Sequence, residues 1–518
     1  MIYCIACFLI CQAKIFIDRE KSKWYTFGVN HRHCKEITMI SFLIGLGILI
    51  GGGILYAFFV ERFFSPDDRK TPAVLKADGV DYVPMKSWKN SLIQFLNIAG
   101  TGPILGPIQG ILFGPIAFIS IPIGCVIGGC FHDYMSGMIS LRNGGMQMPS
   151  LVGKYLGKPV YHIYNTFISL LMLLVGAVFI YTPGDLFVGQ VLGVAPVSTN
   201  WIVWVVYGVI FFYYLIATLF PIDKIIGKIY PIFGLLLIIS TLIIGVGLFF
   251  KGYNFTELSK SNWKGVEPNG LHFIPIFFVT VACGIVSGFH STQATMIARS
   301  VTHEKQGLFT FYYMMLLEGL VAMIWAAAAM GLYNKVGGVD PSQIGKPAMI
   351  GLIAKDIMGY WGGLVAVIGV VVLPITSGDT ALRSLRLMLA DYLGYEQKSK
   401  RNRIILTLAI FIPVIAILIF AKLNANGFNI LWRYFAWSNQ TIAVFAFAMI
   451  GVYLLSVKKS PVMALIPGGF YMFIISSYIL NAKIGFNLPW AISYLVAGGL
   501  TVVYVASILF VGMRGKKE

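Results

Sequence analysis

Charge is scarce in this sequence, and negative charge is the scarcer sign. Asp, Glu, Lys and Arg make up only 12% of the 518 residues, with 21 acidic residues against 39 Lys and Arg. Hydrophobic residues make up 58%, and the mean hydropathy is +0.80. So few charges cannot cover so much apolar surface, which excludes a water-soluble globular protein. We predict an all-α protein that crosses a lipid bilayer many times.

Signature motifs of membrane-embedded enzymes are missing as well. His303 and Glu304 begin a stretch like HExxH, but Gly307 stands where the second histidine is needed, and no GxSxG stretch occurs. No pair of carboxylates has the spacing of a metal site. We therefore expect no enzymatic activity, no cofactor and no metal. A channel remains an alternative, and so does a membrane-embedded enzyme with this acid–base set: His290, Glu318 and Asp379.

Cysteine is also rare, and its distribution is uneven. Four of the seven cysteines lie in the first 34 residues: Cys4, Cys7, Cys11 and Cys34. No second ligand cluster follows them, so we do not expect a metal site there. This segment lacks the basic leader and the small-residue cleavage site of a signal peptide. Because Met39 opens a typical membrane segment, we expect residues 1–38 to be a mis-assigned or disordered extension.

Positive charge is the polar feature that the chain does have, with a net charge of +18. Lys and Arg collect in short segments between apolar runs, mainly after the odd-numbered runs, as the positive-inside rule predicts. We therefore place these loops and the tail MRGKKE in the cytoplasm. The expected partners are the lipid bilayer and a small-molecule substrate, and not nucleic acid.

Apolar runs of roughly 20 residues predict about 13 transmembrane helices and leave no soluble domain. The first is predicted to be an extra N-terminal helix and the last two to be additional C-terminal helices. The predicted spans cover residues 39–60, 88–112, 114–142, 160–182, 200–221, 228–250, 270–299, 308–333, 360–391, 402–421, 429–456, 461–480 and 488–512.

Two of these spans are rich in residues that interrupt a helix. The second carries NIAGTGPILGP at 97–107, and the seventh carries GIVSGFHSTQATMIARS at 284–300. In lipid, a broken helix is tolerated only where its freed N–H and C=O groups face protein, water or a ligand. The alternative role for the polar groups is hydrogen bonding between helices, which we expect of Asn439 and Gln440. We predict a solute site at the two breaks, formed by Gly100, Thr101, Gly102, Pro103, Gly106, Gly288, Phe289, His290 and Gln293.

The two interrupted spans begin five helices apart in the predicted order. Because an odd number of crossings reverses direction, residues 88–250 and 270–456 are predicted to be five-helix repeats of opposite topology. The helix at 39–60 and the two helices within 461–512 lie outside these repeats. Paired interrupted helices in inverted halves are typical of the midplane binding site of a secondary transporter.

The ninth span carries a further polar stretch, VVLPITSGDTALRSLRLMLAD, at 371–391. Pro374 and Gly378 are expected to loosen the helix here. Asp379 lies about one turn from Arg383, so a buried ion pair is predicted beside the ion-coupling role and does not exclude it. The predicted ligands of a coupling ion, H⁺ or Na⁺, are Thr376, Ser377, Asp379 and Thr380.

His132 and Asp133 lie toward the predicted cytoplasmic end of the third span. We group them with Arg383 as gate residues or structural ion-pair residues. For His132 and Asp133, a solvated helix end is an equally good interpretation.

Four stretches resemble signatures of the carbon starvation protein (CstA) family: LNIAGTGPILGPI, VSGFHSTQATMIAR, VVLPITSGDTALRSLRLMLAD and WRYFAWSNQ. The resemblance runs from about residue 86 to the tenth or eleventh span. It implies a transporter of the bacterial inner membrane that imports di- or tripeptides during carbon starvation, driven by H⁺ or Na⁺. Proton-coupled symport of pyruvate or another small carboxylate is the alternative.

The resemblance also implies a fold. The family is similar to the amino acid, polyamine and organocation superfamily, which has a LeuT-like five-plus-five inverted repeat. The second and seventh spans would then be the broken first and sixth core helices. The TSGDT stretch of the ninth span would lie where related folds hold a coupling cation.

Overall fold

The computed structural model describes residues 39–78, 82–219, 223–259, 271–336, 347–395 and 400–514. The predicted extension at 1–38 therefore lies outside the described residues. Throughout the described ranges the chain forms helices and irregular connections, and no strand occurs in them. Among the described residues, eleven helices are long and apolar enough to cross a membrane. The prediction of an all-helical, multi-pass membrane protein is confirmed.

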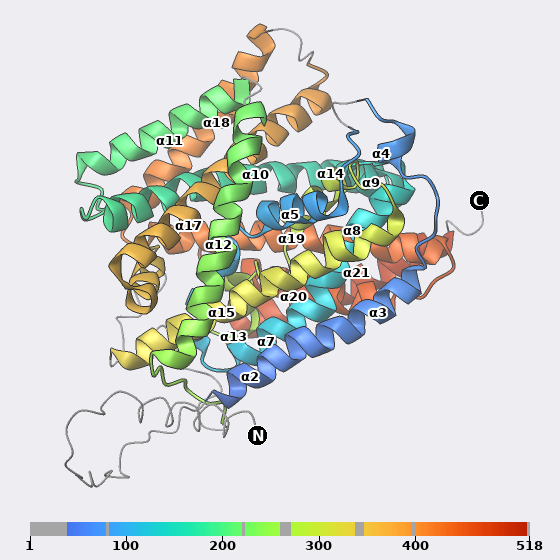
Figure 1. The fold of residues 1–518 in the computed structure, drawn as a ribbon. Helices are drawn as coiled ribbons and strands as arrows, with labels where there is room; N and C mark the ends of the chain where they lie inside the picture. Colours follow the sequence, from blue (N-terminus) through green and yellow to red (C-terminus); the bar gives the residue numbers. More distant parts are fainter. Residues whose placement is uncertain are drawn as a thin grey trace, which may run out of the picture. The chain divides into compact units, whose positions relative to one another are not determined.

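The first half of the chain runs from α2 to α12, and most of its helices are labelled in Figure 1. Several are continued by short π- or 3-10-helical turns. The bounds are α2 (Ile40–Gly47), η1 (Ile48–Gly52), α3 (Gly53–Phe64), α4 (Pro72–Leu75), α5 (Ser87–Ile98), α6 (Gly102–Gly110), η2 (Ile111–Phe113), α7 (Ala117–Gly124), η3 (Cys125–Cys130), α8 (Phe131–Arg142), α9 (Met148–Leu156), α10 (Lys158–Leu186), η4 (Phe187–Val191), α11 (Trp201–Leu219) and α12 (Asp223–Phe250).

The second half begins with another pair of short helices and continues with long ones. The bounds are α13 (Phe273–Thr280), α14 (Gly288–Ile297), η5 (Glu304–Gln306), η6 (Leu308–Tyr312), α15 (Tyr313–Lys335), α17 (Ala348–Leu393), α18 (Lys400–Leu423), α19 (Gly427–Ser456), α20 (Val462–Asn481) and α21 (Trp490–Arg514).

Both predicted interruptions are present. The first separates α5, which ends at Ile98, from α6, which begins at Gly102. The second separates α13, which ends at Thr280, from α14, which begins at Gly288. The described residues therefore contain eleven continuous spans and not the thirteen predicted, because each of these two spans is divided into short helices.

The helices that surround the breaks are the most buried. In their most apolar windows, α19 is 94% buried and the segment containing α15 is 89% buried, against 17% for α21. α21 and the α2–α3 segment carry many exposed aliphatic and aromatic side chains, as expected for helices that face lipid. The interior of the bundle is therefore the place for polar groups within the membrane.

Helix α17 differs from the prediction for the ninth span. Its kink lies at Gly359, where φ is 75°, a conformation that glycine adopts without strain. From there the helix is continuous through Pro374 and Gly378, so the expected loosening at these residues is wrong. Gly378 instead leaves room for the phenol of Tyr214, whose hydroxyl donates to the Phe179 carbonyl at 2.8 Å and lies 3.3 Å from the Pro374 carbonyl.

Candidate functional site

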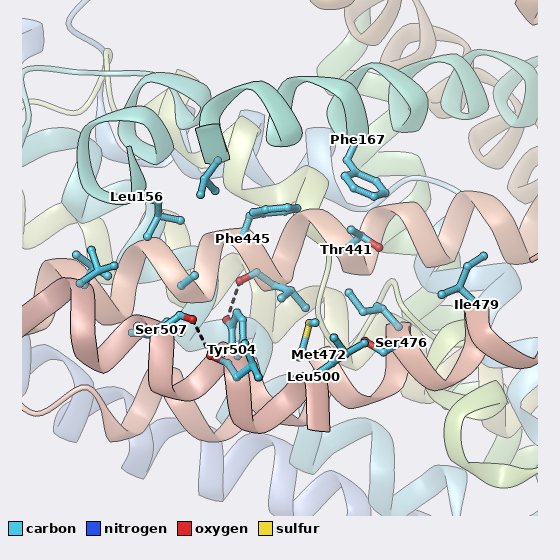
Figure 2. Close-up of a pocket in the computed structure, with 18 of the residues that line it drawn as sticks. Leu156, Phe167, Thr441, Phe445, Met472, Ser476, Ile479, Leu500, Tyr504 and Ser507 are labelled. Carbon is cyan, nitrogen blue, oxygen red and sulfur yellow. Dashed lines mark hydrogen bonds between the residues drawn. The ribbon is translucent and has the colours of Figure 1, made fainter. Parts of the chain in front are cut away.

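An apolar hollow with a volume of about 420 Å³ lies between α10, α19, α20 and α21 (Figure 2). Its lining includes Leu156, Phe167, Phe445 and Leu500 and contains no acid, histidine, lysine or arginine. The few hydroxyls are engaged locally; Tyr504, for example, donates to the Val444 carbonyl at 2.8 Å. A groove of this chemistry suits lipid tails and not a polar solute.

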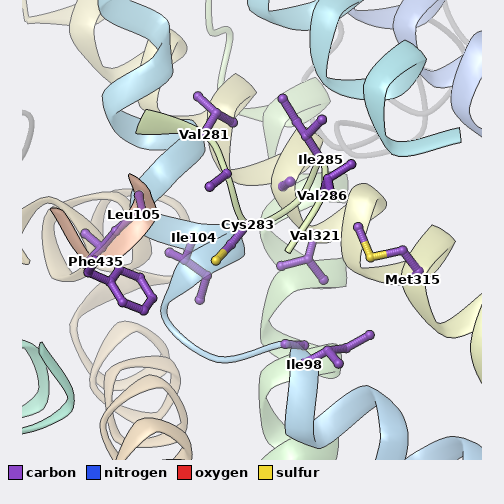
Figure 3. Close-up of a cluster of buried hydrophobic side chains, with 14 of the residues drawn as sticks. Ile98, Ile104, Leu105, Val281, Cys283, Ile285, Val286, Met315, Val321 and Phe435 are labelled. Atoms are coloured by element: carbon purple, nitrogen blue, oxygen red, sulfur yellow. The ribbon is translucent and has the colours of Figure 1, made fainter. Parts of the chain in front are cut away.

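The two broken helices lie against each other at a second location. A Cβ atom built on Gly102 would stand 2.5 Å from the Cys283 sulfur, and one built on Gly106 would stand 3.0 Å from the Thr280 carbonyl oxygen. Figure 3 shows Ile104 of the first broken span beside Cys283 of the second. Glycine is required at this contact because any side chain would force the segments apart.

A small cavity of about 20 Å³ lies between the breaks. A cavity of this size holds about one water molecule. Its walls come from five parts of the fold, namely both breaks, α10, α17 and α19. The lining residues are Asn97, Ile98, Gly100, Gly102, Val175, Phe179, Cys283, Ser287, Phe289, His290, Ser377, Phe435 and Asn439.

The cavity brings together only some of the predicted solute-binding residues. Four of them line it: Gly100, Gly102, Phe289 and His290. The others lie next to the breaks without lining it. Thr101 and Pro103 stand at the buried start of α6, Gly106 packs on α13, Gly288 packs on the α19 backbone, and Gln293 is buried on α14.

Two residues of α19 hold the ends of the second break. The Trp432 indole donates to the Thr280 carbonyl at 3.3 Å, in the last turn of α13. The Asn439 side chain accepts from the Phe289 N–H at 2.8 Å and donates to Ser287 Oγ at 2.9 Å. Because freed N–H and C=O groups at a helix end need partners, these bonds stabilise the interruption.

The predicted hydrogen bonding of Asn439 and Gln440 between helices is confirmed, since Gln440 donates to the Phe278 carbonyl of α13. One N–H group at the start of α14 is thus already used by Asn439.

A chain of four buried ionisable side chains passes from α8 through α14 to α15. His132 Nδ1 is 2.8 Å from Asp133 Oδ1, and Asp133 Oδ2 is 3.1 Å from His290 Nδ1. His290 Nε2 lies 3.4 Å from Glu318 Oε2. No three His, Cys, Asp or Glu side chains of the described residues are arranged to hold a metal ion, so these contacts form a chain and not a metal cage.

This arrangement decides between the two interpretations of His132 and Asp133. Both side chains have 0% exposure and lie inside the bundle, so the interpretation as a solvated helix end is wrong. Polar groups buried to this degree need polar partners, and here His132 Nδ1 and both oxygens of Asp133 have them.

The predicted ion-coupling residues divide into two groups on α17. Ser377 lines the cavity, and its hydroxyl has no hydrogen-bond partner among the described residues. Asp379 is buried and accepts from Tyr213 at 2.5 Å and from Thr380 at 3.0 Å. The Thr376 hydroxyl donates to the Leu373 carbonyl within its own helix. Arg383 donates to the Ala217 carbonyl at 2.9 Å.

Three kinds of residue at this site were not predicted. In the sequence, Glu318 stood out as an acid within an apolar span and as part of the acid–base set of the alternative enzyme, but not as part of a solute or ion site. Asn439 stood out only as a helix contact, and Phe179 and Phe435 did not stand out. A lone carboxylate in a membrane helix is by itself a signal of function, and that signal was available for Glu318. The aromatic walls carry no signal, because Phe is common throughout the chain.

Comparison with known protein families matches residues 37–216, 198–349 and 330–478 to the carbon starvation protein CstA. The chain belongs to the CstA family. An uncharacterized membrane protein of Haemophilus influenzae is 38% identical in an alignment 344 residues long, and the alignment covers 58% of this chain and 93% of that protein. The peptide transporter CstA of Escherichia coli is 23% identical in an alignment 521 residues long, and the alignment covers 76% of this chain and 73% of that protein. The CstA relatives thus include proteins named as transporters.

The fold is similar to that of a solved membrane transporter. A manganese transporter of Eremococcus coleocola aligns with a TM-score of 0.58 at 11% identity, over 85% of this chain and 99% of that one. A point mutant of the same transporter, at 12% identity, aligns with a TM-score of 0.55 over 83% of this chain and 94% of that one. At this identity the likeness concerns the fold of this CstA-family chain and not its cargo.

Proposed function

We propose that this protein is a secondary active transporter that imports short peptides across the bacterial inner membrane. The observation that carries the proposal is the meeting of two interrupted helices at a cavity lined by His290, Ser377 and Asn439. Broken helices that face each other inside a bundle supply backbone groups for a solute where lipid could not. The peptide transporters among the CstA relatives support the same substrate class.

The fold supports a proposed inverted repeat. The first broken pair, α5 and α6, is followed by four spans, and so is the second broken pair, α13 and α14. Five crossings in each unit reverse the direction of the second unit relative to the first. On this proposal α2–α3, α20 and α21 lie outside the repeats, and transport proceeds as the broken helices move against the other spans.

The donors at the cavity favour a carboxylate on the solute. Gly102 begins α6 and lines the cavity, so the positive end of that short helix dipole faces the space. The Ser377 hydroxyl, which has no hydrogen-bond partner among the described residues, is a second donor. The start of α14 contributes less than its sequence predicted, because Asn439 occupies the Phe289 N–H.

A smaller solute is the second candidate, and the cavity volume favours it. A space of about 20 Å³ is too small for a dipeptide unless α6 and α14 separate. Pyruvate or another small carboxylate requires much less opening. Proton-coupled symport of such a carboxylate is therefore the alternative function.

Asp379 is our proposed site for a cation that accompanies the solute, H⁺ or Na⁺. It is buried two residues after Ser377 on the same helix, so an ion bound there would lie on another face of the helix that contributes Ser377 to the cavity wall. Tyr213 and Thr380 already donate to its carboxylate and fix its orientation.

Uptake by the purified protein in liposomes tests the function. Alanyl-alanine, trialanine and pyruvate are supplied outside under an imposed H⁺ gradient, an imposed Na⁺ gradient or neither. Accumulation above the outside concentration is expected for one class of solute and one gradient. Uptake that stops at equal concentrations would indicate a channel, and hydrolysis of the peptide without uptake would indicate an enzyme. A role in carbon starvation predicts increased transcription when the carbon source is exhausted.

A further inference from the structure

The imidazole of His290 stands between two carboxylates that come from different helices. Its Nδ1 faces Asp133 of α8 at 3.1 Å, and its Nε2 faces Glu318 of α15 at 3.4 Å. All three side chains are at least 98% buried. Asp133 is held from its other side by His132 at 2.8 Å. Each nitrogen of one ring therefore meets a separate acid.

Glu318 is the least supported member of this set. Neither of its oxygens receives a hydrogen bond of ordinary geometry from the residues that the structure describes. Its nearest donors are the His290 ring and the backbone N–H of Gly284, which lies within the second break. By contrast, the Asp133 carboxylate is contacted on both oxygens. A carboxylate so placed is the one that gains most from a proton.

The net charge of these side chains also indicates that they bind a proton. With Glu318 and Asp133 ionised and His290 protonated, these three side chains carry a net negative charge in a dry interior, which is costly. One additional proton makes the three neutral overall. His132, the fourth ionisable side chain of the set, contacts Asp133. The charges that act on His290 within the described chain come from Glu318 and Asp133, and the other ionisable groups nearby are the thiols of Cys125, Cys130 and Cys283 and the phenol of Tyr164.

We infer that Glu318, His290 and Asp133 form the binding site of a transported proton. The inference rests on the proposed transport function and names one coupling ion for it. It assigns proton binding to the contact of α14 with α8 and α15, separately from the cation proposed at Asp379 on α17. One proton enters from the outer solution, binds at Glu318 or His290, and leaves to the cytoplasm; no bond other than O–H or N–H changes.

The position of His290 explains how this proton would be coupled to the solute. His290 lines the cavity and belongs to α14, the half-helix that begins at the break. With Glu318 ionised and His290 protonated, an ion pair ties α14 to α15. A proton on Glu318 removes that ion pair and leaves His290 paired with Asp133 of α8 alone, so α14 is released from α15. Because both events involve one side chain, proton binding and solute binding must affect each other's affinity.

The test follows proton movement directly. Protein in liposomes that contain a pH-sensitive dye is given alanyl-alanine or pyruvate, and solute uptake and internal acidification are recorded together. The wild-type protein is expected to acidify the interior in proportion to uptake. Glu318→Gln imitates the protonated acid permanently, so it is expected to lose acidification and to lose accumulation by at least tenfold. Its remaining solute exchange is expected to become independent of pH between about 5 and 8.

Two further variants protect this test from a trivial loss of folding. Glu318→Asp keeps a carboxylate and is expected to retain proton movement with a displaced pH profile, which a purely structural role would not produce. Asp356→Asn removes an acid that pairs with Lys335 and Tyr253 outside this set, and it is expected to leave proton movement intact. Each variant is first checked for elution as a single species of wild-type size.

The outcomes separate the two proposals. If the wild-type protein concentrates neither solute under any gradient, the transport function itself fails. If it concentrates a solute with protons and Glu318→Gln keeps the same ratio of protons to solute, the assigned proton site is overturned. The same conclusion follows if acidification is lost in Asp379→Asn but retained in Glu318→Gln.

Discussion

Asn439 shows how much one side chain can contribute to this site. It supplies the acceptor for the first turn of α14 and a donor to Ser287 from a neighbouring helix, and it also lines the cavity. The broken helix therefore depends on a residue located far away in the chain.

Replacing Asn439 with Ala is expected to destabilise the protein by about 1–3 kcal/mol, because the Phe289 N–H and the Ser287 hydroxyl lose their partner. Thermal unfolding in detergent measures the loss. Asn429→Ala is the matched control on the same helix; its amide bonds only the exposed Asn426, and a change within about 0.5 kcal/mol is expected. Equal stability of both variants would show that the hydrogen bonds of Asn439 make no net contribution to stability.

Asp379 is the second residue whose role can be tested alone. Asp379→Asn keeps an oxygen acceptor for Tyr213 but removes the charge that would bind a cation. Gradient-driven accumulation is expected to disappear, while Tyr213→Phe is expected to weaken accumulation without abolishing it. Proteoliposome uptake that stays concentrative in Asp379→Asn would remove the coupling role from this residue.

At the scale of the helices, close approach decides where the two breaks can meet. At Gly102 and Gly106, the α6 backbone lies so close to the α13–α14 segment that there is no room for a side chain. These glycines are thus needed for contact between elements as well as for the interruption of the helix. In contrast, Gly208 in the middle of α11 has no atom within 4 Å of the position of an added Cβ.

Gly102→Ala is expected to cost about 1–3 kcal/mol of stability, because its new methyl group would overlap Cys283. Solute uptake is expected to fall together with stability, since the contact borders the cavity. Gly208→Ala serves as the control and should be neutral or slightly stabilising, because alanine favours a helix more than glycine does. Uptake and melting temperature measured for both variants decide the matter; a wild-type result for Gly102→Ala would contradict the close contact.

At the scale of the whole molecule, orientation follows from charge and not from packing. The described helices would fit together equally well in either direction across a bilayer. Lys and Arg follow mainly the odd-numbered predicted spans, and this asymmetry predicts that the C-terminal tail lies in the cytoplasm.

The orientation can be measured with fusions at residue 518. A fluorescent protein fused there is expected to fluoresce in the cytoplasm, and an alkaline phosphatase fusion is expected to be inactive. The reverse pattern would overturn the assigned topology and would also exchange the inner and outer ends of the proposed transport path.

Hydropathy and the density of Gly and Pro are local properties, and they were enough to locate the spans and both breaks. The second predicted span, 88–112, corresponds to α5 and α6, and its division falls inside the stretch that contains Gly100 and Gly102. The ninth span shows the limit of this approach. Pro374 and Gly378 looked like helix breakers, but neighbouring residues such as Tyr214 accommodate them and the helix continues.

Contacts between segments that are distant in the sequence could not be predicted from local sequence patterns. His290 and Asp133 are 157 positions apart, and no periodicity states that α8 and α15 will meet on opposite sides of one imidazole ring. The composition alone required a membrane protein, because so little charge could not enclose so much apolar surface. Which polar groups pair in the interior was settled by packing, because a buried carboxylate without a partner is too costly and only the folded helices determine what lies within reach.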